Sequence, residues 1–282
     1  MRLEARDKPL DPRSAAACAV VAAREAGVLL RRNLRLVKRV NEATRHDLKL
    51  ELDVRCQRLI ERRLRSGFPG VALLGEEGTT GSEESAWRWV VDPIDGTVNF
   101  AHGIPHACVS IALQERQVDA DGPAVKRGIY RTVAGVVYDP FLDELWEAVA
   151  GAAALLNGRR IRVSQRRRLG EAIVTIGFAK HPSSLQRMLP VFGRLVHRVR
   201  KLRIMGSAAL GLTYVATGRF DGYVETGLRL WDIAAGALIV ECAGGRCDCL
   251  PVRGRHRYAL AASNGLLHRV LGLLAGKPGF TG

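Results

Sequence analysis

Two carboxylates lie three residues apart in the segment Asp92–Thr97, which reads Asp-Pro-Ile-Asp-Gly-Thr. An apolar run at 87–91 precedes the segment and predicts a buried strand that ends in a sharp turn, because Pro93 cannot donate a ladder hydrogen bond. Gly96 and Thr97 can then open a helix whose free N–H groups face an anion. Neighbouring carboxylates repel an anion unless a divalent cation lies between them, and Mg²⁺ takes carboxylate and phosphate oxygens together. The segment therefore predicts metal-assisted phosphate chemistry.

Further acidic side chains follow other expected elements. Glu76 comes after a short strand expected at 71–74, and Asp232 lies in the first turn of an apolar helix expected at 231–243. An acid at a helix start can simply complement the helix dipole, which would account for Asp232 alone. It does not account for Glu76 and the acids of Asp92–Thr97 at consecutive strand ends. Since ligands of open α/β sheets bind at the carboxyl ends of strands, we expect these acids to form one site.

Length and composition predict a globular protein. The 282 residues are 47% apolar and 25% charged, so we expect one domain over 1–282, with a division into sub-domains 1–155 and 156–282 left open. No uncharged apolar stretch reaches about 18 residues, and the first residues lack a signal-peptide pattern. We therefore expect no membrane span and a cytoplasmic location. The six scattered cysteines form no CxxC pair, so we expect free thiols.

The net charge of +15 is unusual, and arginines gather at 158–168 and 193–203. Such clusters can bind nucleic acid or attract anionic substrates. No interleaved aromatic residues, zinc knuckle or recognition-helix pattern accompanies them. We therefore favour a solvated basic face, with attraction of anionic substrate as a further effect.

The hydrophobic pattern predicts a mixed α+β or α/β fold in which helices and strands alternate in the second half. We expect an exposed excursion at 114–131 and a hairpin turn at 156–159. Helices are expected at 14–33 (capped by Ser14), 47–65, 182–198, 206–218, 231–243 and 264–275. Strands are expected at 71–74, 87–91, 107–113, 133–138, 144–149, 173–178, 220–225 and 258–262.

Several of these motifs together resemble the inositol monophosphatase family, which belongs to the Mg²⁺-dependent, lithium-sensitive sugar phosphatases. The resemblance covers about 47–264, and its two long motifs occur in the family's order and spacing. The matching segments are Gly-Glu-Glu at 75–77, Trp-Val-Val-Asp-Pro-Ile-Asp-Gly-Thr-Val-Asn-Phe at 89–100, Trp-Asp at 231–232 with Ala-Gly-Gly at 243–245, and shorter matches at 156–158, 163–164, 206–209 and 221–225. The resemblance implies a layered α-β-α-β-α fold.

The resemblance also implies roles for individual residues. The implied ligands of two or three Mg²⁺ ions are the side chains of Glu76, Asp92, Asp95 and Asp232 and the carbonyl of Ile94. The implied catalytic residues are Thr97, Asp53 and Glu76, with Asp53 orienting Thr97 toward a water molecule. The N–H groups of Gly96 and Thr97 would hold the phosphate, and the implied substrate contacts are Asp95, Ser207, Ala208, Glu225 and Asp232.

The chain departs from the family pattern in two segments. Lys49 and Leu50 stand where the family has Val-Thr before Asp53, and Glu42 or a neighbour stands where many members have lysine. Whether the chain has the family's third metal site is therefore left undecided.

The resemblance implies hydrolysis of a small sugar or polyol phosphate, with inositol monophosphate as the first expectation, by a homodimer without membrane contact. Fructose-1,6-bisphosphatase, histidinol-phosphatase and 3′(2′),5′-bisphosphate nucleotidase activities remain alternatives. A basic regulator that uses the same fold to bind RNA or protein is the non-enzymatic alternative.

Overall fold

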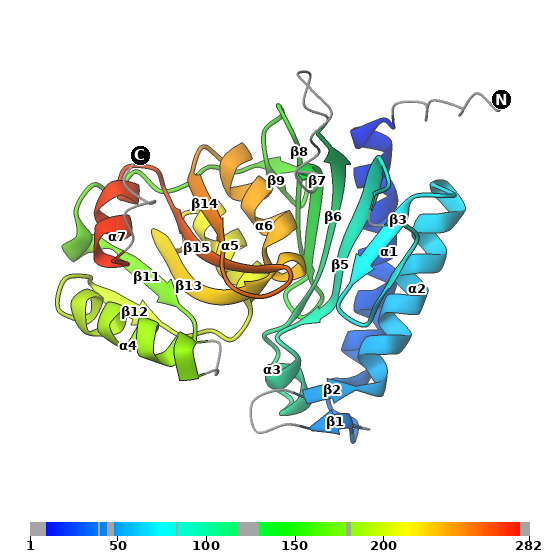
Figure 1. Ribbon diagram of the computed structural model, residues 1–282, viewed down its shortest axis with the longest axis horizontal. Coiled ribbons are helices and arrows are strands. Elements are labelled where there is room, and N and C mark those ends of the chain that lie inside the picture. The colour runs from blue at the N-terminus through cyan, green and yellow to red at the C-terminus, as the bar shows by residue number, and fades with distance from the viewer. Residues whose placement is uncertain are drawn as a thin grey trace.

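The computed structural model arranges the chain in five alternating layers of helices and strands (Figure 1). It describes residues 10–38, 40–43, 48–82, 84–117, 130–178 and 182–276. One outer layer consists of α1 (Pro12–Asn33) and α2 (Glu51–Gly67). The central layer consists of α5 (Ala208–Ala216) and α6 (Leu230–Cys242), and the other outer layer of α4 (Pro182–Val196) and α7 (His268–Leu274). The expected α-β-α-β-α fold is confirmed.

Two large sheets separate these helical layers. The eight-stranded sheet has the order β10-β9-β8-β7-β6-β5-β3-β4, and the five-stranded sheet has the order β12-β11-β13-β15-β14. The first contains β3 (Ala72–Gly75), β4 (Gly78–Thr80), β5 (Trp87–Asp95), β6 (Cys108–Arg116), β7 (Tyr130–Asp139), β8 (Glu144–Val149), β9 (Leu155–Leu156) and β10 (Arg159–Arg160). The second contains β11 (Ile173–Ile176), β12 (Lys201–Arg203), β13 (Gly222–Arg229), β14 (Arg246–Pro251) and β15 (Arg257–Ser263).

The central helix α6 is apolar around most of its circumference because both sheets cover it. Its core cluster includes Val90 and Ala112 from the first sheet and Leu260 from the second. The backbone of α6 lies close to β7: a Cβ added at Gly135 would lie 3.0 Å from Ala235. This packing fixes the start of α6, where Asp232 lies, against the first sheet.

The beginnings of the two outer helices differ from the sequence prediction. Asp11 caps α1 in place of Ser14: its carboxylate accepts the N–H groups of Arg13 and Ser14, each at 3.1 Å. The helix predicted at 47–65 starts later, at Glu51. Residues 48–50 instead form β2 (Leu48–Leu50), which pairs with β1 (Val40–Ala43). Position 47 lies outside the described residues.

Strand β5 extends further than predicted. Its pairing with β6 does not stop at Pro93 but skips it: Asp92 pairs with Ser110, and Asp95 pairs with Cys108. The irregularity between these two pairs accommodates the missing N–H of proline as a bulge. The strand prediction at 87–91 was therefore too short, and both acids belong to the strand itself.

Most other predicted elements are confirmed. The strand at 144–149 has the predicted bounds, and Asn157 and Gly158 turn the hairpin between β9 and β10 with φ of 48° and 75°. Strands β4, β12 and β14 were not predicted. Residues 114–116 and 130–131 of the predicted excursion belong to β6 and β7. Residue 117 follows β6, and positions 118–129 lie outside the described residues. The six cysteines are free thiols.

Among the described residues, no helix is long and apolar enough to cross a membrane.

Candidate active site

Glu76, Asp92 and Asp232 come together through the pairing of two strands and one helix start. β3 and β5 run parallel, and the N–H of Glu76 donates to the carbonyl of Val91 at 3.2 Å, so that Glu76 lies beside Asp92. Ser110, the cross-strand partner of Asp92, donates its hydroxyl to the carbonyl of Trp231 at 3.2 Å. That contact holds the first turn of α6, and with it Asp232, at the same sheet edge.

Asp92 is the most crowded carboxylate of the group. It is 2% exposed, and one of its oxygens accepts the N–H of Ile94 at 3.0 Å across Pro93. Burial, and after it the negative charges of Glu76, Asp95, Asp232 and Asp53, raises the pKa of Asp92 well above its ordinary value. Four other acids therefore act on this one carboxylate, which indicates that the predicted residues share one site.

Asp95 is held by the start of α5. Its Oδ2 accepts the hydroxyl of Ser207 at 2.6 Å and the N–H of Ala209 at 2.7 Å, while Oδ1 accepts the N–H of Ala208 at 3.2 Å. Burial raises the pKa of Asp95, and these donors oppose that change. Ser207 and Ala208, predicted as substrate contacts, therefore position Asp95 in this structure.

The turn after Asp95 requires glycine. Gly96 has φ of 96°, and a Cβ there would lie 2.9 Å from the carbonyl oxygen of His106. Thr97 then begins α3 (Thr97–Ala101), and its hydroxyl donates to the carbonyl of Ile94 at 2.8 Å. The predicted metal-ligating carbonyl and the predicted catalytic hydroxyl are thus direct neighbours.

Asp53 and Asp232 occupy the same position in two different helices. Each is the third residue of its helix, and each accepts the backbone N–H that precedes the helix: Leu50 to Asp53 at 2.7 Å, and Arg229 to Asp232 at 2.7 Å. Burial and the charge of Asp95 raise the pKa of Asp232 well above its ordinary value. Both acids therefore have a capping function in addition to their place in the acidic cluster.

Glu225 lies on β13, on the second sheet, and it is 9% exposed. The hydroxyl of Tyr223 donates to its carboxylate, and burial raises the pKa of Glu225 to about 7. Gly177 leaves room for this side chain, because a methyl group at position 177 would overlap the carboxylate. The charges of Asp95 and Glu225 act on each other, so the second sheet reaches the same site.

The acidic cluster, defined as Asp53, Glu76, Asp92, Asp95 and Asp232, fits a hard divalent cation chemically. All its ligating atoms are oxygens, and like charges that raise one another's pKa are relieved by a cation. In the described part of the chain, no group of three His, Cys, Asp or Glu side chains is arranged to hold an ion as it stands. Asp95 and Asp232 instead direct oxygens to the donors of α5 and α6.

Several supporting residues could not be found from sequence reasoning. Ser110 and Tyr223 are ordinary strand residues whose roles depend on which strand lies beside them. Gln57 accepts the N–H of Glu77 at 2.9 Å from α2, a contact between residues 20 positions apart. Only Gly177 carries a signal, since it lies inside the strand expected at 173–178 and a glycine within a strand often marks a close approach.

Five layers with buried acids gathered at strand ends define the fold class of the sugar phosphatases. A sequence model of the inositol monophosphatase family matches residues 11–271, and the chain belongs to this family. Nus factor SuhB of Pseudomonas aeruginosa is 42% identical over 235 residues, which cover 80% of this chain and 82% of that protein. Inositol-1-monophosphatase of Rhizobium meliloti is 41% identical over 201 residues, 69% of each protein. The crystal structure of extragenic suppressor protein suhB from Bartonella henselae superimposes with a TM-score of 0.82 at 35% identity, covering 93% of this chain and 98% of that one.

Proposed function

We propose that this protein is a Mg²⁺-dependent phosphomonoesterase that acts on a small phosphorylated polyol, with inositol monophosphate as the first candidate substrate. The observation that carries the proposal is the crowding of four other carboxylates around buried Asp92. A protein that served only as a binding module would gain nothing from this arrangement, because burying like charges together without a cation costs stability.

Bound Mg²⁺ would supply positive charge for the phosphate and make a water molecule more acidic. Asp92, Asp95, Asp232, Glu76 and the carbonyl of Ile94 would hold the ions. The backbone N–H groups at the start of α3 would orient the phosphate. In this proposal, the attacking water would give a proton to the hydroxyl of Thr97 as that hydroxyl gives its own proton to the carboxylate of Asp53, which also orients the threonine. Because the transition state of phosphoryl transfer is loose, positioning and charge neutralisation account for most of the expected rate.

The substrate side of the proposed site is formed by the second sheet and the start of α5. Glu225 can accept hydrogen bonds from polyol hydroxyls, and Ser207 and Ala208, which hold Asp95, would supply further substrate contacts. A carboxylate at this position favours a polyol over a second phosphate group. The chain would work as a homodimer in the cytoplasm, as its sequence led us to expect.

Release of inorganic phosphate tests this proposal directly. We expect Mg²⁺-dependent release from inositol monophosphate and less from fructose 1,6-bisphosphate, histidinol phosphate and a 3′-phosphorylated adenosine nucleotide. EDTA should abolish release, and Asp95→Asn should abolish it without unfolding the protein. Absence of phosphate release from all four substrates with Mg²⁺ present would overturn the proposal.

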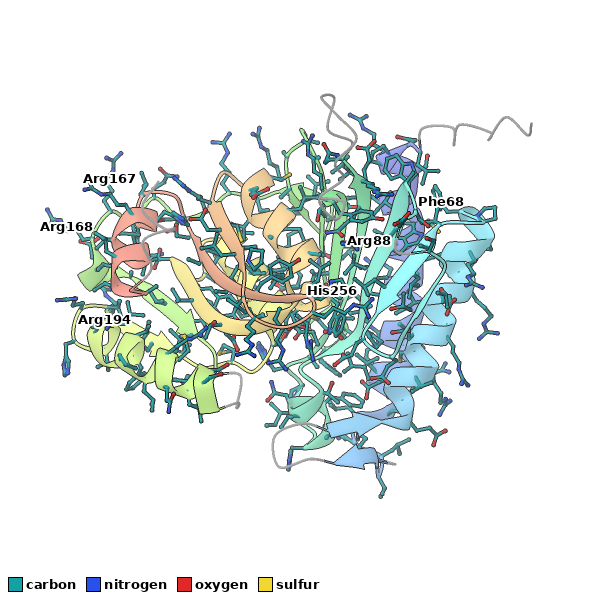
Figure 2. The ribbon with its side chains drawn as sticks, viewed as in Figure 1. Phe68, Arg88, Arg167, Arg168, Arg194 and His256 are labelled. Carbon is teal, nitrogen blue, oxygen red and sulfur yellow. The ribbon has the colours of Figure 1, made fainter. Side chains whose placement is uncertain are left out.

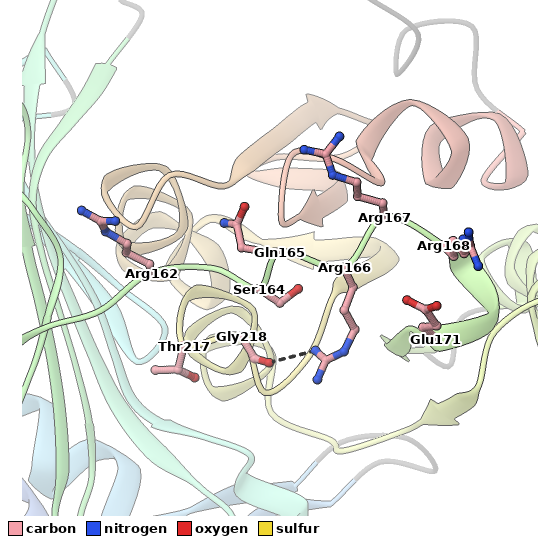
Figure 3. A pocket seen from close by; sticks show the side chains of 9 residues that line it. All are labelled: Arg162, Ser164, Gln165, Arg166, Arg167, Arg168, Glu171, Thr217 and Gly218. Carbon is pink, nitrogen blue, oxygen red and sulfur yellow. Dashed lines mark hydrogen bonds between the residues drawn. The ribbon is translucent and has the colours of Figure 1, made fainter.

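A second candidate function is a non-catalytic regulator of transcription, which the name Nus factor SuhB of several relatives and the net charge of +15 favour. Arg167, Arg168 and Arg194 lie at the end of the molecule formed by α4 and α7 (Figure 2). A shallow hollow of about 610 Å³ beside them is lined by Arg162 and Arg166, and the guanidinium of Arg166 donates to the carbonyl of Gly218 (Figure 3).

Nucleic acid bound to this surface would show an affinity that falls steeply with salt, because each neutralised phosphate releases counterions. Fluorescence anisotropy with a labelled single-stranded RNA measures that slope, and Arg167→Gln with Arg168→Gln should reduce it. If this protein releases phosphate but binds no RNA even at low salt, the regulator function is excluded.

A further inference from the structure

A second hollow lies between the first sheet and α6, apart from the acidic cluster. It measures about 1780 Å³, which exceeds the roughly 300–1,000 Å³ of usual small-molecule sites. Strands β5, β6 and β7 form one wall, α6 the opposite wall, and the turn between β14 and β15 closes one side. We call this hollow the lateral groove; Arg88 and His256, which both line it, are labelled near the centre of the molecule in Figure 2.

The helix wall of the lateral groove is apolar. Its residues recur at helical spacing along one stripe of α6: Leu230, Ile233, Ala234, Ala237 and Leu238. Asp232 does not belong to this stripe, so the acidic cluster lies on another side of the same helical turn. A ligand in the groove would therefore contact the turn that carries Asp232 without touching Asp232 itself.

The sheet wall carries a row of hydrogen-bonded polar side chains. Arg88 donates from Nε to Gln114 at 2.9 Å, and Gln114 donates in turn to the hydroxyl of Thr132 at 3.0 Å. These three residues are cross-strand neighbours on β5, β6 and β7, and Gln114 is only 4% exposed. The guanidinium carbon of Arg88 lies 3.6 Å from the centre of the Tyr130 ring. The row holds Arg88 in one orientation at the groove.

The groove is also net cationic. Among its described lining residues, four arginines face two glutamates, and one of those glutamates, Glu241, already interacts with Arg131. Burial lowers the pKa of Arg88, because it disfavours the charged guanidinium. Among the described residues, no carboxylate forms an ion pair with Arg88 to offset this cost. After burial, the charges of Arg88, Arg255 and Arg229 lower the pKa of His256, so these cations lie close together. An anion among them would relieve their mutual repulsion.

We propose that the lateral groove binds a small organic anion that carries a flat apolar group. The anionic end would accept hydrogen bonds from Arg88 and Arg255, because planar guanidinium groups match carboxylate and phosphate oxygens. The flat group would pack between Tyr258 and the apolar stripe of α6 at Ala237, which is partly exposed. This inference does not depend on the proposed phosphatase activity.

Titration calorimetry in EDTA tests it with phenylphosphonate, which combines both features and contains no hydrolysable ester. Without metal ions, the acidic cluster repels anions, and the groove variants distinguish binding in the groove from binding in the arginine hollow, the one lined by Arg162 and Arg166. We expect saturable binding of phenylphosphonate. Methylphosphonate and benzyl alcohol, which each lack one feature, should bind at least about tenfold more weakly.

Arg88→Met removes the charge and keeps an apolar stem, and we expect it to weaken phenylphosphonate binding at least about tenfold, as the loss of a charged hydrogen bond implies. Arg62→Met, at an exposed arginine of α2 outside the groove and outside the arginine hollow, is the matched control and should leave the affinity unchanged. Because Arg88 also packs on Tyr130, Arg255→Gln on the exposed turn provides a second variant that should bind more weakly while its circular dichroism spectrum stays that of the folded protein. No saturable binding by wild type below about 10 mM, or unchanged affinity in both groove variants, would overturn the proposal.

Discussion

Replacement of Glu225 by glutamine should stabilise the metal-free protein, and the gain should depend on pH. The folded state raises the pKa of Glu225 from its ordinary value of 4.5 to about 7, so between these values the folded protein keeps a proton that the unfolded chain has lost. The contribution of Glu225 to the free energy of unfolding is therefore greatest below pH 4.5, and it is lost as the pH rises through 7. The difference corresponds to a loss of about 3 kcal/mol at alkaline pH.

Glutamine has the shape of the protonated carboxyl and can still accept the hydroxyl of Tyr223, so Glu225→Gln avoids this loss. Urea unfolding in EDTA should show a gain below about 1 kcal/mol at pH 5 and near 3 kcal/mol at pH 8.5. Glu84→Gln, at an exposed glutamate, is the control and should show no comparable pH-dependent gain. Equal stability of wild type and Glu225→Gln at every pH would refute the reasoning.

Three further changes have definite expected results. Asp95→Asn should lower phosphate release at least about a hundredfold while the circular dichroism spectrum stays unchanged, because charge neutralisation supplies most of the catalysis. Gly96→Ala should lower the free energy of unfolding in urea by more than about 2 kcal/mol, because φ is 96° there and the new Cβ would meet the carbonyl of His106. Gly170→Ala, where a Cβ would point into open space, is the control and should change it by less than about 0.5 kcal/mol. Gly177→Ala should lower the unfolding temperature, and adding Glu225→Ala should restore part of it, since the clash is with that carboxylate; no recovery in the double variant would contradict this.

The sequence predicted those parts of the fold whose signals are local. A long apolar stretch located α6, and Asn157-Gly158 located a hairpin, because both patterns depend only on neighbouring residues. The course of β5 past Pro93 could not be predicted in the same way. A strand can resume after proline only where a partner strand accepts a bulge, and Ser110 and Cys108 on β6 provide that partner.

In the candidate site, too, residues with a local sequence signal were predicted, whereas contacts between distant segments were not. Four of the acids were named from their places at expected strand ends and at a helix start, and Asp53 from the family resemblance, but the hydrogen bonds that hold them were not predicted. Ser207 was expected to contact substrate, whereas its hydroxyl donates to Asp95. The short strand β14 was missed because its alternation of polar and apolar residues spans only positions 246–249. It forms at the edge of the second sheet by pairing with β15.

We propose above all that the acidic cluster binds Mg²⁺. Titration calorimetry of the wild-type protein with MgCl₂ at pH 8 tests it most directly, with Asp92→Asn as the comparison because Asp92 lies among the other four acids. We predict saturable Mg²⁺ binding by wild type that Asp92→Asn weakens at least about tenfold. Absence of saturable binding by wild type, or equal binding by the variant, would contradict the account.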